Sequence, residues 1–322
     1  MSDAVARLKA QLPEHPSVDE LTPLADDYTG LRILAVHAHP DDESSKGSAS
    51  AAAYTDRGAR YMVATMTGGE RGDILNEEIK HSPRAHRDLP GMRRSEMAAA
   101  AKAIGIEHRW MGFVDSGLPE GDPMPPLPFG CFGVQPLERA AAPLVRLVRE
   151  YRPHVMISYD EIGGYPHPDH IMSHKVAVEA YEKAGDPEAY VGEGQPWAPL
   201  KLYYDRAFNP ERLVAGHEFL MARDGQSVFS GWIENLADRV STEGIRHEST
   251  TRIPSSAYFD RRDQAMLAHA SQIDPNGAFF AIPTEDVKKV WPWEDYTLIA
   301  SRVPVDLPEC CLADGLDYKA AG

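Results

Sequence analysis

Short apolar runs alternate with longer amphipathic stretches along the first half of the chain. Residues 31–36 form an apolar run followed by a polar turn, which is typical of a strand buried in a parallel sheet. Similar runs predict further strands, and apolar positions spaced by about 3.6 residues predict helices between them. The predicted strands are 60–66, 109–113 and 154–159, and the predicted helices are 48–57, 92–104 and 137–151.

Strands that alternate with helices build βαβ units, and these units form a parallel sheet with right-handed crossovers. The sequence therefore predicts an α/β fold with a Rossmann-like, mostly parallel sheet flanked by helices. In such sheets ligands bind beyond the carboxyl ends of the strands. We therefore expect the loops that follow residues 36, 66, 113 and 159 to meet and to carry the active site.

The pattern is less regular elsewhere. Segment 115–136 is rich in proline and glycine and too long for a simple connection, so it is either a functional loop or an insert. Beyond residue 200 the spacing predicts strands over 201–206 and 296–303 and a helix over 257–270. Residues 1–30 are polar, with a short helix predicted over 4–12.

Composition excludes several classes of protein. The 322 residues include 49 acidic and 33 basic side chains, a net charge of −16. Nucleic acids and anionic membranes bind basic surfaces, so neither is an expected partner, and no apolar stretch reaches the about 18 residues of a membrane span. The three cysteines lack the spacing of a disulfide framework or a zinc site. Free thiols and the lack of a secretory signal pattern favour a cytoplasmic protein.

The loop after the first predicted strand reads HAHPDDE at residues 37–43. A histidine and three carboxylates therefore crowd residues 39–43 at a strand end. Like charges this close repel one another and raise each other's pKa values, which a bound divalent cation would relieve. Taken alone, however, a histidine and an aspartate at this spacing are common in loops.

A second polar motif, GGYPHPDH at residues 163–170, follows the fourth predicted strand. Pro168 suits the first turn of a helix, and a helix is predicted over 171–184. Because both motifs follow strands of one parallel sheet, they should lie at the same edge. Two histidines and one carboxylate from separate strand ends form a three-ligand site with an open position, the arrangement of catalytic zinc.

These motifs resemble those of the LmbE-like (PIG-L-type) metal-dependent N-deacetylases, over about residues 31–305. More narrowly, the chain resembles the mycothiol S-conjugate amidases. The stretches that carry the narrower resemblance are TGGERGD at 67–73, GFVDSGLPEGDP at 112–123, GGYPHPDH at 163–170 and QIDP at 272–275. The resemblance implies an N-terminal extension over 1–30, a single enzyme domain over 31–305 and a tail over 306–322, with the C-terminal third as a smaller subdomain that covers the substrate.

The resemblance also assigns roles in the two motifs. It implies that His39, Asp42 and His170 bind the metal and that Asp41 is the general base. It implies that His167 steadies the oxyanion or protonates the leaving amine. The chemistry agrees, because amide hydrolysis needs a nucleophile at neutral pH and a metal lowers the pKa of its bound water toward about 7. Neighbouring aspartates cannot easily both reach one ion, so one of them is free to accept the proton of the water.

Four further residues complete the predicted site. Asp169 is expected to hydrogen-bond a histidine and raise its basicity. By resemblance, Tyr165 donates to the developing oxyanion, and its alternative role is packing at the rim of the site. Arg93 and Asp115 match positions that hold the sugar-inositol portion of a substrate, although Arg93 could equally be a solvated residue at a helix start.

The expected cofactor is a single Zn2+ per chain, because hydrolysis needs a Lewis acid without redox change. Two histidines and one carboxylate also serve Fe2+, which remains the alternative. The resemblance implies a cytoplasmic amidase that cleaves mycothiol S-conjugates, small-molecule thiol conjugates, to a mercapturic acid and glucosaminyl-inositol in detoxification.

Two rivals stay open at this stage. One is an N-acetylglucosaminyl-inositol or related sugar deacetylase of thiol or antibiotic biosynthesis, which would use the same machinery. The other is a non-catalytic Rossmann-like module that binds a metal or a nucleotide. Amidase and deacetylase differ on the acyl side of the scissile bond, where the sequence predicts that segment 115–136 and the C-terminal third line the pocket.

Overall fold

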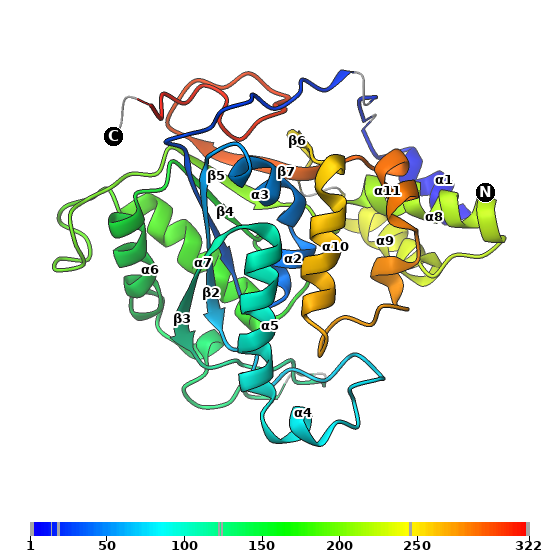
Figure 1. The fold of residues 1–322 in the computed structure, drawn as a ribbon, viewed down its shortest axis with the longest axis horizontal. Helices are drawn as coiled ribbons and strands as arrows, with labels where there is room; N and C mark the ends of the chain where they lie inside the picture. Colours follow the sequence, from blue (N-terminus) through cyan, green and yellow to red (C-terminus); the bar gives the residue numbers. More distant parts are fainter. Residues whose placement is uncertain are drawn as a thin grey trace.

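The computed structural model describes residues 3–13, 15–17, 20–121, 123, 125–244 and 247–319. Within these residues one mixed sheet of seven strands runs in the order β3-β2-β1-β4-β5-β7-β6 (Figure 1). Strands β1 to β5 pair in parallel, whereas β7 pairs antiparallel with both β5 and β6. The strands are β1 (Arg32–His37), β2 (Arg60–Thr67), β3 (Glu107–Phe113), β4 (Val155–Ser158), β5 (Lys201–Asp205), β6 (Thr251–Pro254) and β7 (Trp293–Ser301).

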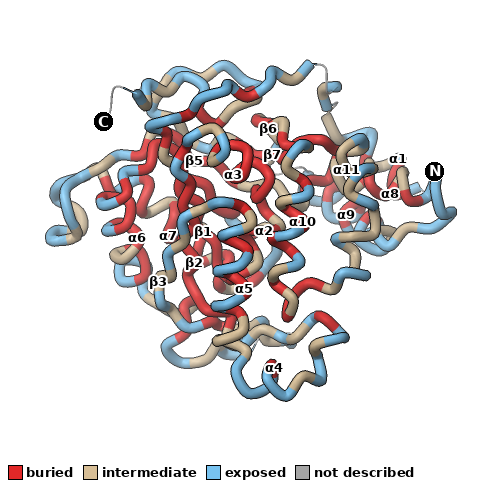
Figure 2. Tube along the Cα trace, viewed as in Figure 1, coloured by how far each residue is buried: buried red, intermediate tan, exposed pale blue. Residues whose placement is uncertain are grey.

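Helices cover both faces of the sheet, because successive residues of the central strands point to opposite sides. Ile33 packs in a core shared with α3 (Ser48–Thr55), α5 (Leu89–Ile104) and α10 (Phe259–Ala268). Its neighbour Leu34 packs in a second core. That second core is shared with α6 (Leu137–Tyr151) and α7 (Pro168–Lys183), and the buried strands run between the two helical layers (Figure 2). The prediction of an α/β fold with a mostly parallel sheet is confirmed.

The predicted strands and helices lie within a few residues of the observed ones, but several elements were missed. The missed elements are α2 (Asp42–Ser45), α4 (Pro83–Arg87), α8 (Pro210–Asp224), α9 (Ser230–Glu243), α11 (Thr284–Val290), β6 and the short 3-10 turns η2 (Phe132–Val134), η3 (Ser256–Tyr258) and η4 (Ala278–Phe280). Among the described residues, no helix combines the length and apolar character needed to cross a bilayer.

Both ends of the described chain pack against the rest of the molecule. Helix α1 (Asp3–Lys9) contributes Val5 and Leu8 to a small core with Ile233 of α9. Near the other end, Leu312 is buried in the core that contains Ile33. The terminal segments therefore contribute to the packing of the main body of the fold.

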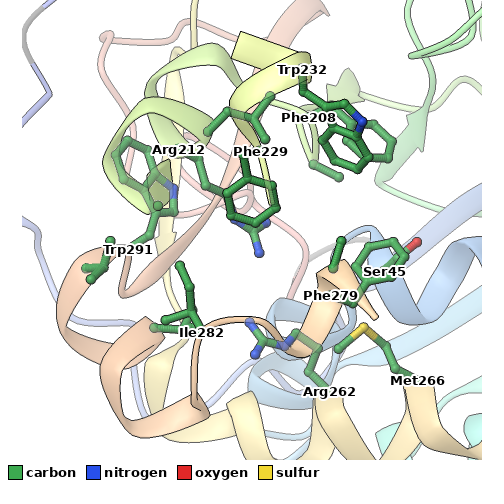
Figure 3. A pocket seen from close by; sticks show the side chains of 16 residues that line it. Ser45, Phe208, Arg212, Phe229, Trp232, Arg262, Met266, Phe279, Ile282 and Trp291 are labelled. Carbon is green, nitrogen blue, oxygen red and sulfur yellow. The ribbon is translucent and has the colours of Figure 1, made fainter. Parts of the chain in front are cut away.

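Helices α8 to α11 surround an apolar pocket of about 110 Å3 beside the main sheet. Its walls include Phe208, Phe229, Trp291 and Met266, and Figure 3 shows these side chains arranged around an open space. Ser45, at the end of α2, also lines the pocket. Because α2 follows β1 directly, the pocket adjoins the loop that carries the first polar motif.

Candidate functional site

The loop after β1 turns sharply into α2 at Asp41. This residue has a φ angle of 124°, which is rare for a side chain with a Cβ atom. Glu43 stabilises the turn, because its Oε2 atom accepts a hydrogen bond from the Asp41 backbone N–H over 2.9 Å. His269 contacts the other Glu43 oxygen over 2.6 Å. The turn places the side chains of Asp41 and Asp42 in different surroundings.

Three side chains from the two motifs converge at the carboxyl ends of β1 and β4. His39, Asp42 and His170 each offer one ligand atom, and these atoms lie within 4.8 Å of one another. The Asp42 Oδ2 atom is 3.5 Å from His170 Nε2 and 3.7 Å from His39 Nδ1. All three residues are buried. The structure therefore brings together the three predicted metal ligands.

The orientation of His170 leaves one ring nitrogen free for a metal. Its Nδ1 atom lies 2.9 Å from the Gly163 carbonyl oxygen, which only accepts, so Nδ1 carries the proton. The Nε2 atom is buried and has no hydrogen-bond partner among the described residues. Burial also holds the pKa of His170 well below its ordinary value, so the ring is neutral. A neutral imidazole with an unused lone pair is the form that binds a metal.

Asp42 is held in place by donors that the sequence analysis did not identify. Tyr159 donates its hydroxyl to Asp42 Oδ2 over 2.7 Å, and the His39 backbone N–H donates to the same oxygen over 2.9 Å. Lys46, one helical turn further along the chain, forms a buried ion pair with Asp42 Oδ1. Burial opposes ionisation, but the Lys46 ammonium and the protonated His39 hold the pKa of Asp42 well below its ordinary value. Asp42 is therefore a carboxylate.

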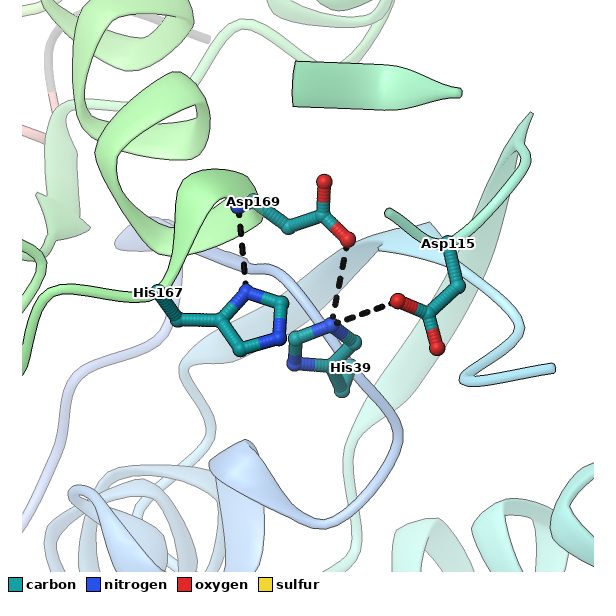
Figure 4. Close-up of side chains that lie close together, drawn as sticks. All are labelled: His39, Asp115, His167 and Asp169. Atoms are coloured by element: carbon teal, nitrogen blue, oxygen red, sulfur yellow. Dashed lines mark hydrogen bonds and ion pairs between the residues drawn. The ribbon is translucent and has the colours of Figure 1, made fainter. Parts of the chain in front are cut away.

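A second group of side chains shares His39 with the first (Figure 4). The His39 Nε2 atom lies 3.3 Å from Asp169 Oδ2 and 3.6 Å from Asp115 Oδ1. Although burial lowers it, the contacts with Asp115 and Asp169 raise the pKa of His39 to about 10. Ser116 orients Asp169 by donating both its backbone N–H and its hydroxyl. The predicted contact between Asp169 and a histidine is present. Asp42, Asp115 and Asp169 surround His39, and their combined negative charge favours a positive charge there.

His167 and Tyr165 contribute two further rings beside this group. The His167 ring is 4.6 Å from the His39 ring, measured between centroids, and its Nδ1 atom accepts a hydrogen bond from the Asp169 backbone N–H. That bond leaves Nε2 to carry the proton. Burial and the nearby His39 lower the pKa of His167 to about 4, so its ring is neutral. Tyr165 packs edge-on against His170, and 38% of the tyrosine is exposed.

Asp41 is turned toward Arg93 on helix α5. Arg93 Nη2 lies 3.2 Å from Asp41 Oδ1 and donates to the Pro40 carbonyl over 2.6 Å, while Nη1 donates to the Gly69 carbonyl over 3.0 Å. Burial raises the pKa of Asp41, whereas Arg93 opposes that rise. Arg93 is buried, so the interpretation of this residue as solvated at a helix start is wrong. It joins the loops after β1 and β2.

Asp115 lies directly after β3 and next to His39. Its Oδ2 atom accepts a hydrogen bond from the Arg71 backbone N–H over 3.0 Å, and its Oδ1 atom accepts one from Gly117 over 2.7 Å. The carboxylate is buried. Two backbone donors and His39 therefore surround it, and the expected loops meet at one edge of the sheet.

Comparison with known proteins identifies the family. Residues 34–181, which include both motifs, match the family model described as PIG-L: GlcNAc-PI de-N-acetylase. A mycothiol S-conjugate amidase of Streptomyces coelicolor is 46% identical over 292 residues, covering 90% of this chain and 99% of that protein. The chain belongs to the PIG-L family. The resemblance inferred from the sequence motifs is thereby confirmed.

Other members of the PIG-L family are also similar. A 1D-myo-inositol 2-acetamido-2-deoxy-alpha-D-glucopyranoside deacetylase of Thermobispora bispora is 38% identical, covering 84% of this chain and 88% of that protein. The structure of N,N'-diacetylchitobiose deacetylase from Pyrococcus horikoshii superimposes with a TM-score of 0.55 over 83% of each chain. At 15% sequence identity, that likeness supports the fold alone.

Proposed function

We propose that this PIG-L family protein is a metal-dependent amidase that cleaves mycothiol S-conjugates to a mercapturic acid and glucosaminyl-inositol. The observation that carries the proposal is the buried triad His39, Asp42 and His170, in which His170 Nε2 faces a carboxylate and has no hydrogen-bond partner among the described residues. The mycothiol substrate is supported by the 46% identity to the amidase over nearly its whole length. The reaction would belong to detoxification of thiol-reactive compounds.

The triad fits a resident metal ion. Two imidazoles and a carboxylate with converging ligand atoms are the donor set of catalytic zinc sites, and a bound ion would displace the proton that Asp115 and Asp169 otherwise favour on His39. Zn2+ is our first choice, with Fe2+ as the alternative. A bound ion of this kind would lower the pKa of its water and polarise the amide carbonyl. Asp169, which accepts hydrogen bonds from Ser116, holds the His39 ring, and the Gly163 carbonyl holds the His170 ring. We propose one ion per chain.

We assign the remaining steps of amide hydrolysis to groups beside the triad. The Asp41 carboxylate, with 26% of its side chain exposed, is the proposed base, and Arg93 limits the rise of its pKa. The neutral His167 is the proposed donor to the oxyanion or the leaving amine. Tyr165 is partly exposed beside these residues and is the second proposed donor to the oxyanion. Asp169 acts by orienting His39.

Arg93 and Asp115 stay our candidates for the sugar-inositol portion. Both side chains are already bonded to the protein, but Arg93 Nε is buried without a hydrogen-bond partner among the described residues. The two residues also determine how the loops after β1, β2 and β3 approach one another. We further propose a cytoplasmic location, which the free cysteines 131, 310 and 311 support.

A deacetylase is the second candidate, because the Thermobispora deacetylase is 38% identical. The test is release of free amine from purified, metal-loaded protein with two substrates, a mycothiol S-conjugate and N-acetylglucosaminyl-inositol. We expect kcat/KM to favour the conjugate by about tenfold or more, a difference of about 1.4 kcal/mol in transition-state binding. A preference for the acetyl substrate would support the deacetylase, and no amine release from either would support a non-catalytic module.

A further inference from the structure

The pocket between α8 and α11 combines apolar walls with an unpaired cation. Thirteen of its 16 lining residues are apolar or glycine, and the exceptions are Ser45, Arg212 and Arg262. No carboxylate lines it among the described residues. Figure 3 shows the Arg212 side chain entering the pocket from α8, with Arg262 on the opposite wall.

The charges of the two arginines have different surroundings, because only Arg262 pairs with a carboxylate. Arg262 pairs with the Asp263 carboxylate over 2.7 Å and lies 4.2 Å above the ring of Phe259. Among the described residues, Arg212 has neither an ion-pair partner nor a hydrogen-bond partner, unlike Arg262. Burial and the neighbouring Arg262 lower the pKa of Arg212, whereas the carboxylates of Asp295 and Glu294 oppose that fall without an ion pair to Arg212. A guanidinium group in an apolar pocket without a direct partner is costly, and an anionic ligand that contacts Arg212 would relieve that cost.

Helix α2 connects the pocket to the proposed base. Asp41 precedes the first turn of α2, and Ser45 ends the helix four residues further along the chain. Both residues are partly exposed, whereas Asp42, Glu43 and Ser44 between them are buried. Ser45 donates a hydrogen bond to the Asp41 carbonyl over 3.4 Å. The exposed edge of α2 thus leads from the site of hydrolysis to the pocket.

The geometry of a cysteinyl conjugate matches this path. The sulfur lies three bonds from the scissile carbonyl carbon, about 4 Å in an extended chain, and the S-substituent begins there. A substituent that leaves the hydrolytic site along α2 would therefore reach the pocket with its first atoms. The pocket volume, about 110 Å3, is of the order of a cavity that holds one benzene ring, about 150 Å3.

We propose that this pocket receives the S-substituent of the conjugate, and that Arg212 selects ring-sized apolar substituents that carry an anionic group. The inference rests on the proposed amidase function and adds the substrate class that the amidase prefers. The proposed acyl-side pocket is lined by the C-terminal third and by Ser45. Segment 115–136, which the sequence analysis also expected there, contributes none of the described lining residues. Trp232 and Phe279, both exposed, form its rim.

The test compares kcat/KM for four mycothiol conjugates at constant ionic strength. Their S-substituents are methyl, benzyl, 4-carboxybenzyl and 4-(trimethylammonio)benzyl, so the three rings differ in charge while their attachment is identical. For the unmodified protein we expect 4-carboxybenzyl to exceed benzyl by about tenfold, as for a charge-assisted hydrogen bond, and the cationic ring to be poorest. In Arg212→Met the ratio of carboxybenzyl to benzyl should fall to near one.

The matched control is Arg139→Met, which removes an exposed arginine from α6 on the other helical layer and should keep the ratio. Equal rates for the three rings with the unmodified protein would overturn the proposal, and so would a ratio that Arg212→Met leaves intact. If Arg212→Met does not fold, the comparison of anionic and cationic rings in the unmodified protein decides. Failure to hydrolyse any conjugate, the S-methyl one included, would refute the amidase function itself.

Discussion

Arg93 Nη2 lies 3.2 Å from Asp41 Oδ1 and joins helix α5 to the loop after β1. Asp41 has a φ angle of 124°, a conformation that costs about 1–3 kcal/mol and persists only when its surroundings enforce it. Arg93 contributes to that enforcement through the Pro40 carbonyl as well as the Asp41 side chain. The proposed base therefore depends on a residue that follows the next strand, β2, along the chain.

Arg93→Lys should lower kcat more than it raises KM. Lysine cannot bond to the Pro40, Asp41 and Gly69 oxygens in one fork, so the Asp41 carboxylate loses its orientation. We expect kcat to fall by about 10–100-fold, because small misplacements of reacting groups are costly. Steady-state kinetics with a mycothiol conjugate measures both parameters. Arg94→Lys changes an exposed neighbour and is the control. A raised KM with unchanged kcat would instead indicate that Arg93 acts mainly on the sugar.

Asp41→Asn should abolish most turnover without removing the metal. Asparagine keeps the shape of the side chain but cannot accept the proton, so we expect kcat to fall by about 10²–10⁴-fold. Metal analysis of the same preparation should give the ion content of the unmodified protein, because Asp41 lies outside the triad. Loss of the metal with nearly normal activity per bound ion would mean that Asp41 and Asp42 have exchanged roles.

His170→Ala should lose the metal ion. The substitution removes the Nε2 atom that faces Asp42, and two ligands rarely hold zinc against water. Elemental analysis after gel filtration should find about one ion per chain in the unmodified protein and far less in the variant. His86→Ala removes an exposed histidine from α4 and should keep the ion. Full metal content in His170→Ala would contradict the ligand set.

The metal triad was predictable from the sequence because of the topology of a parallel sheet. The two motifs follow β1 and β4, and parallel strands bring their carboxyl ends to one edge whatever lies between them. Lys46 and Tyr159 were missed for different reasons. Lys46 lies four residues from Asp42 on a helix too short to show a hydrophobic period. Tyr159 looks like a buried core residue in sequence, and only the structure shows its hydroxyl on Asp42.

The C-terminal third shows where local pattern is insufficient. Helix α9 carries buried apolar residues at 233, 236, 237 and 240, a helical spacing, so this helix was predictable and was missed. Strand β6 was not predictable in the same way, because it has only four residues and ends at Pro254. Its position depends on pairing with β7. The pocket itself lies between four separate helices, and no local sequence motif predicts how these helices pack.

Glu309→Gln should destabilise the fold, because it separates a buried ion pair. Glu309 and Lys201 are both fully buried, and Tyr203 donates to Glu309 over 2.7 Å. Glutamine keeps the shape but leaves the Lys201 ammonium without a countercharge, which typically costs about 3–5 kcal/mol. Urea unfolding should show this loss in the free energy of unfolding.

The control for this prediction is Glu107→Gln, whose ion pair with Arg60 is largely exposed to solvent. Exposed pairs contribute about 0–1 kcal/mol, so the control should lose little stability. Unequal losses would show that the segment around Glu309 is held by buried charge and is part of the cooperative fold. Equal losses in the two variants would mean that water reaches Lys201 when Glu309 is neutralised, and that this segment separates from β5 before the sheet unfolds.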